Sequence, residues 1–427
     1  MSSTVAVEDL RLGMYIHLEG GWLSHPFPLS SFRISSATEI ATLRALGLAR
    51  VCWVPEKSEL ASETPSAPPA AAPVVLSPAQ HAAEQQRQWL ADQRESALRC
   101  ERQHGEAAKA WREATDALGA QPLLAAATTV SLTQAMLDKM LACEKMGIRL
   151  VGGGGDRAAS HALNVAVISM LIGRTLGLTD GEMLDLGVGA LQHDVGKQDL
   201  PDRLRHAEDN FTGAEINGYR DHVAKGVLQG QRMKLSVGAL MVIAQHHEHA
   251  DGSGFPLRLP SDRLSLGARI VAIVNRYDNL CNPGSRGLPL TPHEAVAMLF
   301  SQSRTRFDPP VLNAFIRMMG VYPAGSLVQL TDDRYAMVVG VNSTRPLKPR
   351  VLVHGGALAR AGLRAAAAGD VQAQMLDLET QVDLGIRRSL AASKVPPAVL
   401  TSLDPRPRVA YYFEPLAREA QPQELAA

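Results

Sequence analysis

The sequence predicts a mainly α-helical protein, with an all-α domain over residues 119–320 between a small mixed α/β module and a β-rich C-terminal appendage. Apolar residues recur at helical spacing through most of the central domain, as in HALNVAVISMLIGRTLGL, and strand patterns are sparse there. After Val321, the stretch SLVQLTDDRYAMVVGVNS alternates apolar and polar residues on both sides of a turn, which is the pattern of a β-hairpin.

Two regions precede the helical domain. Residues 1–56 combine strand spacing in VAVEDLRLGMYIHL with a helical pattern that ends at Gly47 and a short strand, RVCWVP. Residues 57–118 begin with a Pro/Ala-rich linker and continue into a long polar helix over 80–118. That helix is either a solvated connection or a contact that joins two chains into a homodimer.

The helical domain and the tail divide into expected elements. We expect helices in ATTVSLTQAMLDKMLACEKMGI, in DGEMLDLGVGALQHDVGK and in HEAVAMLFSQS. In residues 321–427, the stretch PRVLVHGG adds a third strand after the hairpin, and an amphipathic segment and the strand-like VAYYFEP follow.

Composition narrows the class of protein. The 427 residues hold 43 Lys+Arg and 43 Asp+Glu, so no overall basic excess favours a nucleic-acid polymer as partner. The four cysteines are far apart and form no CxxC pair, which is typical of a reducing cytosol. No signal peptide and no apolar stretch of about 20 residues is evident, so we expect a cytoplasmic protein that does not enter a membrane.

Histidines and one carboxylate recur on successive helices of the central domain, in the order H…HDxGK…H…HHExxDGxGxP. Neutral imidazole and carboxylate together suit divalent iron, manganese or zinc. A carboxylate next to a histidine lets one helical turn serve two metals, and two metals about 3.5–4 Å apart can cleave a phosphodiester. Lys197 follows Asp194 by three residues and lies on the same face if the helix continues.

Five stretches of the chain resemble the HD-GYP family of the HD phosphohydrolase superfamily. They are HALNV, GALQHDVGKQDLPD, HHEHADGSGFP, LGARIVAIVNRYDNL and RFDPPVL, within roughly residues 155–310. The resemblance implies an all-α HD-type domain that holds two or three iron or manganese ions. It also implies hydrolysis of cyclic di-GMP to pGpG or onward to GMP. The N-terminal segment LRLGMYIHLEGGWLSHPFPLSSFRISS is similar to a small domain of unknown function often found before HD-GYP domains.

The resemblance also implies roles for individual residues. Asp194 and Lys197 match catalytic positions. The positions of metal ligands are occupied by His161, His193, Asp194, His222, His246, His247 and Asn275. The positions that contact substrate are occupied by Lys197, Gly254, Phe255, Pro256 and Arg286.

Several of these positions depart from the family pattern. Arg157 stands where three-metal members carry a glutamate, so we expect two divalent transition metals, Fe or Mn. Asn275 replaces a ligand aspartate, and an amide oxygen is a weaker donor than a carboxylate. Phe255 replaces the tyrosine of the GYP motif, His206 stands where lysine is common, and Arg286 lies in an irregular segment. These changes predict reduced metal affinity and reduced activity.

Three functions are consistent with this pattern. The first is a metal-dependent phosphodiesterase that hydrolyses cyclic di-GMP in bacterial second-messenger signalling. The alternative is a catalytically impaired HD-GYP protein that binds cyclic di-GMP or a protein partner and acts as a regulator. The third is an HD phosphohydrolase for another nucleotide or phosphate ester, and the HHExxDGxG segment argues against it.

Overall fold

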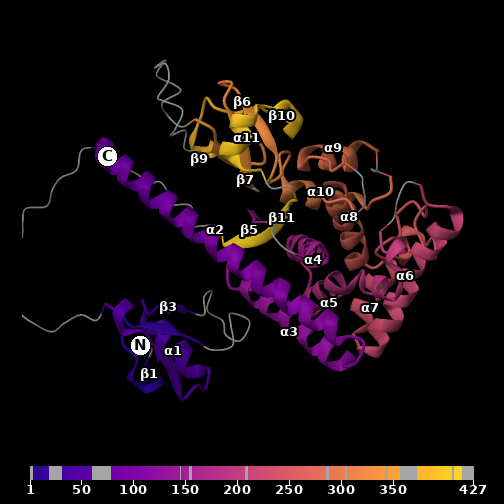
Figure 1. Cartoon of the computed structure of the whole chain (residues 1–427), viewed down its shortest axis with the longest axis horizontal. Coiled ribbons are helices and arrows are strands. Elements are labelled where there is room, and N and C mark those ends of the chain that lie inside the picture. Colours follow the sequence, from indigo (N-terminus) through magenta and orange to yellow (C-terminus); the bar gives the residue numbers. More distant parts are fainter. Residues whose placement is uncertain are drawn as a thin grey trace, which may run out of the picture. The chain divides into compact units, whose positions relative to one another are not determined.

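Helices and strands in the computed structural model follow the predicted class, mainly α with β-containing regions at both ends (Figure 1). The structure describes residues 3–18, 31–59, 78–144, 146–152, 156–206, 210–284, 288–302, 305–341, 345–355, 373–405 and 408–415. Contacts divide the chain into two compact units, Met1–Arg99 and Cys100–Ala427. Most of the expected Pro/Ala-rich linker lies outside the described residues.

The first unit contains an antiparallel sheet covered by one helix. Its strands, in the order of the sheet, are β1 (Ser3–Ala6), β4 (Arg50–Trp53), β2 (Tyr15–His17) and β3 (Ser31–Arg33). Helix α1 (Ala37–Ala45) begins at a capping box formed by Ser36 and Glu39. The expected strand in VAVEDLRLGMYIHL is divided, because a 3₁₀ turn at Val7–Asp9 separates β1 from β2.

The long polar helix predicted at 80–118 is α2 (Pro78–Ala117). Cys100, Ala107, Ala110, Ala114 and Ala117 lie on its C-terminal half, and the first four are buried. Small side chains of this kind allow a helix to approach its neighbours closely. The C-terminal half of α2 is therefore part of the second unit and is not a fully solvated connection.

The next eight α-helices in the described part of the second unit precede its C-terminal strands. They are α3 (Pro122–Leu141), α4 (Arg157–Thr175), α5 (Asp180–Gln192), α6 (Gly213–Arg232), α7 (Val237–Gln245), α8 (Leu266–Cys281), α9 (Pro292–Gln302) and α10 (Pro309–Met319). Helix α4 is buried throughout residues 162–173 because α5, α8, α10 and a C-terminal strand surround it. Capping boxes at Thr179 and Thr212 fix where α5 and α6 begin.

One segment of the helical domain is a strand. The first expected helix ends at Leu141, and β5 (Met146–Val151) follows it. Strand β5 pairs antiparallel along its length with β11 (Ala410–Pro415), which is the predicted strand VAYYFEP. The periodicity of ACEKMGIRLV did not reveal this strand, because its partner lies more than 250 residues further along the chain.

The same sheet contains the predicted hairpin, β6 (Leu327–Leu330) and β7 (Tyr335–Gly340). Strand β8 (Arg350–Val353) pairs with β7 and with β9 (Gln374–Asp377), and β10 (Ile386–Leu390) pairs with β6. The amphipathic segment is α11 (Pro397–Leu403), which packs on β7. Among the described helices, none is both long and apolar enough to cross a bilayer.

A buried charge cluster holds this sheet together. Arg149 on β5 and Glu414 on β11 are almost completely buried, and Arg149 Nε lies 2.5 Å from Glu414 Oε2. The other oxygen of Glu414 accepts a hydrogen bond from Arg350 on β8. Burial alone would raise the pKa of Glu414, but Arg350 and Arg149 outweigh it and hold that pKa below its usual value.

We predict that Glu414→Gln lowers the free energy of unfolding by about 3 kcal/mol, because it leaves two guanidinium groups near a neutral side chain in the interior. Since the pKa of Glu414 is lower in the folded state, the carboxylate stabilises the protein above the unfolded-state pKa, about 4.3. Its contribution is lost as pH falls through the folded-state value. Denaturant titrations at neutral and acidic pH test this, with the exposed Glu101→Gln as control. Equal stability of wild type and Glu414→Gln at neutral pH would contradict the prediction.

Candidate metal centre

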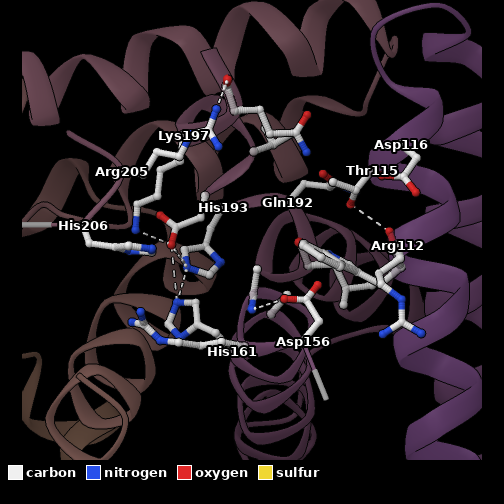
Figure 2. A pocket seen from close by; sticks show the side chains of 18 of the residues that line it. Arg112, Thr115, Asp116, Asp156, His161, Gln192, His193, Lys197, Arg205 and His206 are labelled. Atoms are coloured by element: carbon white, nitrogen blue, oxygen red, sulfur yellow. Dashed lines mark hydrogen bonds and ion pairs between the residues drawn. The ribbon is translucent and has the colours of Figure 1, made fainter. Parts of the chain in front are cut away.

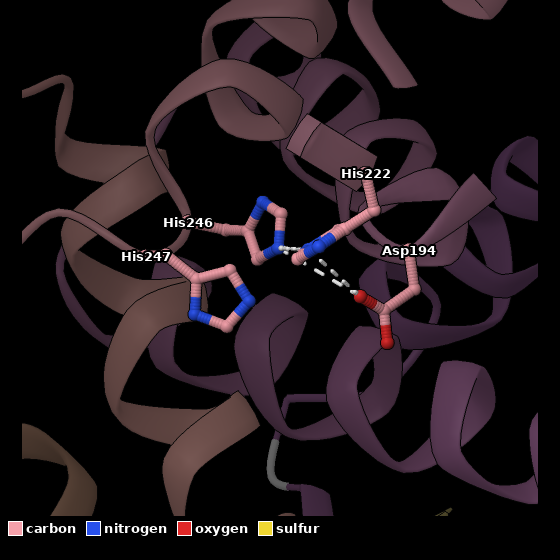
Figure 3. Close-up of side chains that lie close together, drawn as sticks. All are labelled: Asp194, His222, His246 and His247. Carbon is pink, nitrogen blue, oxygen red and sulfur yellow. Dashed lines mark hydrogen bonds and ion pairs between the residues drawn. The ribbon is translucent and has the colours of Figure 1, made fainter. Parts of the chain in front are cut away.

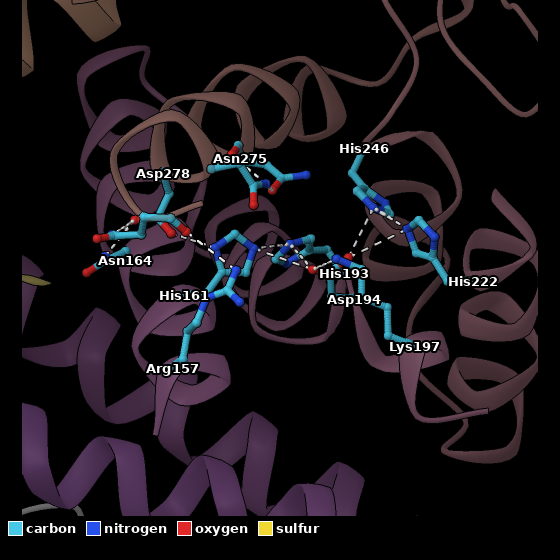
Figure 4. Close-up of polar contacts among 12 residues, drawn as sticks. Arg157, His161, Asn164, His193, Asp194, Lys197, His222, His246, Asn275 and Asp278 are labelled. Carbon is cyan, nitrogen blue, oxygen red and sulfur yellow. Dashed lines mark hydrogen bonds and ion pairs between the residues drawn. The ribbon is translucent and has the colours of Figure 1, made fainter. Parts of the chain in front are cut away.

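The predicted histidines converge from four helices onto one carboxylate (Figures 3 and 4). His161 lies in the second turn of α4 and His222 lies inside α6. The pair His193–Asp194 directly follows the last residue of α5, and the pair His246–His247 directly follows α7. Helix ends therefore supply most of the cluster.

Three of the histidines are held by the same local hydrogen bond. In each, Nδ1–H donates to the backbone carbonyl three residues earlier: His193 to Ala190 at 2.7 Å, His222 to Tyr219 at 2.6 Å, and His246 to Ile243 at 2.8 Å. Because Nδ1 carries the proton in this arrangement, the lone pair of Nε2 is available to a metal. This orientation of imidazole is the one that metal sites in proteins use.

Each oxygen of Asp194 faces a different set of histidines. Oδ2 lies 3.4 Å from Nε2 of both His161 and His193. Oδ1 lies 3.6 Å from Nε2 of His222 and 3.8 Å from Nε2 of His246. Within each set the imidazoles are also close, with Nε2 atoms 3.1 Å apart for His161 and His193 and 3.4 Å apart for His222 and His246. Atoms that share a metal at about 2.0–2.1 Å are separated by roughly these distances.

The donor set fits divalent metal. Two groups of residues have ligand atoms that all lie within 4.8 Å of one another. The first group is His161, His193 and Asp194, and the second is Asp194, His222, His246 and His247. Two buried atoms, Asp194 Oδ1 and His247 Nε2, have no hydrogen-bond partner among the residues that the structure describes, although burying such atoms without a partner is costly. A cation between them would satisfy both.

The protonation states of three histidines agree with this assignment. Burial lowers the pKa of His222 to about 4 and holds the pKa values of His246 and His247 well below their usual range. Burial would also lower the pKa of His161, but hydrogen bonds to Asp194 and Asp278 raise it to about 9. Two carboxylates around one imidazole create a negative potential, which favours a cation at this position.

Lys197 lies beside Asp194, but the backbone between them is not the continuing helix that was expected. Helix α5 does not continue through it, because Val195–Asp199 form a 3₁₀ turn. Lys197 Nζ nevertheless lies 2.6 Å from Asp194 Oδ2, and it lies 5.4 Å from the ring centre of Tyr219. Burial opposes the charge on Lys197, but Asp194 outweighs it and the pKa of Lys197 rises. The lysine therefore stays charged beside the cluster.

Gly196 permits the close approach of this turn to α6. A Cβ atom at this position would lie 2.0 Å from the carbonyl oxygen of His222 and 2.3 Å from the nitrogen of Gly226. Any side chain would therefore push the turn carrying Lys197 away from the helix carrying His222. The glycine of the HDVGK motif has this steric explanation.

Asn275 and Asp278 lie on α8, near the cluster, and have different contacts (Figure 4). The amide oxygen of Asn275 accepts a hydrogen bond from Asn279 Nδ2 at 2.6 Å. Asp278 Oδ2 lies 2.6 Å from Nδ1 of His161, so this carboxylate orients a predicted ligand from behind. The sequence pattern alone did not indicate this contact.

Asp278 is in turn fixed by two amides that bind the C-terminal strand region. Its Oδ1 accepts hydrogen bonds from Asn164 at 2.7 Å and from Asn282 at 2.9 Å. The same two amides donate to the carbonyl of Val409, and Asn164 Oδ1 accepts from the backbone nitrogen of Tyr411. The orientation of His161 thus depends on residues near the end of the chain.

The loop that resembles the GYP motif packs against His247. The ring of Phe255 stacks on the imidazole of His247 with centroids 4.4 Å apart and an angle of 19°. A Cβ at Gly254 would lie 2.5 Å from backbone atoms of residues 247–249, so this position needs glycine. The Phe255–Pro256 peptide is cis, and Pro256 is exposed.

Glu248, which sequence reasoning did not single out, fixes this loop. Its buried carboxylate accepts backbone N–H groups of Leu257 at 2.7 Å, Arg258 at 3.1 Å and Leu259 at 3.0 Å. The acidic residue of the HHE triplet was the only local sign of this role. The sequence does not show that three backbone amides converge on that carboxylate.

A pocket of about 410 Å³ opens onto one side of the cluster (Figure 2). Of the predicted site residues that the structure describes, His161, His193, Asp194 and Lys197 line it. Arg157, Arg205 and His206 line it too, so its walls carry several basic groups. Sequence reasoning missed the contribution of Trp111, Arg112, Thr115 and Asp116 from α2. Arg286 lies outside the described residues.

We predict that Glu248→Gln lowers the free energy of unfolding by about 2 kcal/mol, because an amide nitrogen replaces an acceptor that faces backbone N–H groups. Amide hydrogen exchange at residues 257–259 should accelerate in the variant. The exposed Asp262→Asn on the same loop is the control. Unchanged exchange at these three amides would show that Glu248 does not hold the loop.

Comparison with known proteins agrees with these features. The family model of the HD domain matches residues 139–311, and that of a domain of unknown function matches residues 2–129, which extends through α2 into α3. A cyclic di-GMP phosphodiesterase of Pseudomonas aeruginosa is 29% identical over 83% of this chain and 85% of its own length. A 3′3′-cGAMP-specific phosphodiesterase of Vibrio cholerae is 30% identical over 37% of this chain and 30% of its own length.

Among solved structures, an HDG"Y"P protein from Bdellovibrio bacteriovorus aligns with a TM-score of 0.39 and 17% identity, covering 74% of this chain and 98% of that chain. The two family matches and the long alignment with the Pseudomonas protein agree with the motifs and with the His/Asp cluster. Residues 139–311 therefore match the HD domain family, and the part of the chain before them matches a domain of unknown function.

Proposed function

We propose that this protein is a metal-dependent phosphodiesterase that hydrolyses cyclic di-GMP to pGpG and/or GMP. The observation that carries the proposal is the division of the Asp194 carboxylate between two histidine sets. The Pseudomonas relative, which aligns over most of both chains, is named a cyclic di-GMP phosphodiesterase, and this name supports cyclic di-GMP as the substrate. The alternative of a receptor that does not hydrolyse cyclic di-GMP gains no support from these relatives.

Two divalent transition metals, Fe or Mn, are the proposed cofactors. His161 and His193 would hold one, His222, His246 and His247 the other, and Asp194 would bridge them. Bound in this way, a metal pair supplies a water activated at neutral pH and a charge that stabilises the phosphate oxygens. Arg157 lies at the pocket near His161, where a cationic side chain disfavours a third metal.

The chain's own residues contribute binding and orientation. Lys197 stays charged beside Asp194 and lines the pocket, so it can pair with a phosphate oxygen of the substrate. Arg157 Nη1 donates to the carbonyl of Gly284 at 2.6 Å, while its buried Nε has no hydrogen-bond partner in the described part of the chain. That arrangement fixes a second positive charge across the pocket. Phe255 supports His247 by stacking, and we assign it a positioning role.

We predict that the protein isolated with Fe(II) or Mn(II) holds about two metals per chain and converts cyclic di-GMP to pGpG. His222→Ala should lose about one metal and reduce turnover by at least about 100-fold, because a ligand of the second set is removed. His17→Ala, an exposed histidine of the first unit, is the control. Absence of both bound metal and turnover in the wild type would refute the proposed function.

The variant Asn275→Asp tests whether the amide at this position limits metal binding. A carboxylate is a stronger ligand than an amide, so we predict about tenfold tighter metal binding and faster turnover at limiting metal. The variant can still accept the hydrogen bond from Asn279. Metal titration followed by turnover measures the effect. Unchanged affinity would mean that residue 275 does not take part in metal binding.

A further inference from the structure

Helix α2 forms one wall of the substrate pocket. Trp111, Arg112, Thr115 and Asp116, from its last two turns, line the same cavity as His161, His193 and Asp194. In Figure 2 the helix that carries Arg112, Thr115 and Asp116 faces Lys197, His206 and His161 across the cavity. None of these α2 residues belongs to the metal cluster. The wall therefore stands apart from the residues that could hold metal.

This wall is fixed to the helix that carries the dyad. The indole nitrogen of Trp111 donates to the carbonyl of Leu191 at 2.9 Å, two residues before His193. Ala114 and Leu118 are buried beneath the same turns. Thr115 Oγ1 donates to the carbonyl of Trp111 at 2.7 Å. The wall consequently has a defined position relative to Asp194.

Two charged side chains of this wall are available to a ligand. Arg112 and Asp116 are exposed, and neither side chain has a hydrogen bond or ion pair with any other residue that the structure describes. They stand four residues apart on a helix, so their Cβ atoms are neighbours at about 6 Å on one face.

We propose that Arg112 and Asp116 recognise a guanine base of the cyclic dinucleotide. Guanine presents two acceptors, O6 and N7, to which arginine can donate in a bidentate manner. It presents two donors, N1–H and the N2 amino group, which a carboxylate can accept. The i, i+4 pair offers both complementary groups. This inference rests on the proposed function, since it assigns a specificity wall to the same pocket.

Adenine has the opposite pattern at two of these positions. Its N6 amino group would face the donors of Arg112, and its N1 acceptor would face the carboxylate of Asp116. Both contacts are unfavourable, so the wall selects guanine over adenine. The relevant alternatives are chemically close, because cyclic di-GMP, 3′3′-cGAMP and cyclic di-AMP differ only in these bases.

The test compares kcat/KM for these three dinucleotides, using the full-length metal-loaded protein. We predict that wild type prefers cyclic di-GMP and that Asp116→Asn reduces its preference over cyclic di-AMP by about tenfold or more. Asparagine can pair with adenine, so KM for cyclic di-AMP should fall while KM for cyclic di-GMP rises. Arg112→Gln should reduce the preference similarly. In both variants kcat for cyclic di-GMP should change little, because the reacting phosphate is contacted elsewhere.

Matched controls lie on the same helix outside the pocket. Glu113→Gln and Arg102→Gln remove the same charges at exposed positions and should leave the preference unchanged. An unaltered preference in both Asp116→Asn and Arg112→Gln would overturn the inference. So would an equal loss for all three dinucleotides, because that indicates a general charge effect and not base recognition.

The outcome separates this inference from the proposed function. If wild type hydrolyses cyclic di-GMP without the predicted effect of the variants, only the inference fails. If wild type hydrolyses none of the three, the proposed function fails, and calorimetric affinities of the same proteins for the three dinucleotides decide the inference. Affinities that do not distinguish guanine from adenine in the wild type would then overturn it.

Discussion

The carboxylate of Asp194 is the group on which the arrangement of the site depends. Its two oxygens face two histidine sets that come from four helices, so the helices must meet at one point. Backbone carbonyls orient three imidazoles, and the absence of a side chain at Gly196 lets the turn after the dyad approach α6. Burial keeps three of the histidines neutral, which is the state that binds metal.

The two ends of the second unit complete the site. Asp278 holds His161 and is itself fixed by Asn164 and Asn282, which bind the backbone at the start of β11. That strand pairs with β5 inside the helical part of the chain, and Glu414 joins it to two buried arginines. At the other end, α2 supplies a wall of the pocket. The helical core alone would therefore lack part of its support.

The sequence predicted the features that depend on local patterns. Helical periodicity indicated α3, α4, α5 and α9, and the HD and HH pairs within the spaced histidine pattern indicated the cluster. Features that depend on residues far apart in the chain could not be predicted from the sequence. Strand β5 forms by pairing with the distant strand β11. The role of Glu248 depends on three backbone amides that lie nine to eleven residues later in the chain. The position of Arg112 at the pocket depends on how α2 packs. The conformation at Lys197 was also missed, because nothing local distinguishes a 3₁₀ turn from a continuing helix there.

The proposed metal centre requires that Asp194 joins two metals in one site. Electron paramagnetic resonance of the Mn(II)-loaded protein tests it most directly, because two manganese ions bridged by a carboxylate are magnetically coupled. We predict a coupled two-manganese spectrum for the wild type and loss of the coupling in Asp194→Asn. A spectrum of isolated, uncoupled manganese in the fully loaded wild type would contradict it.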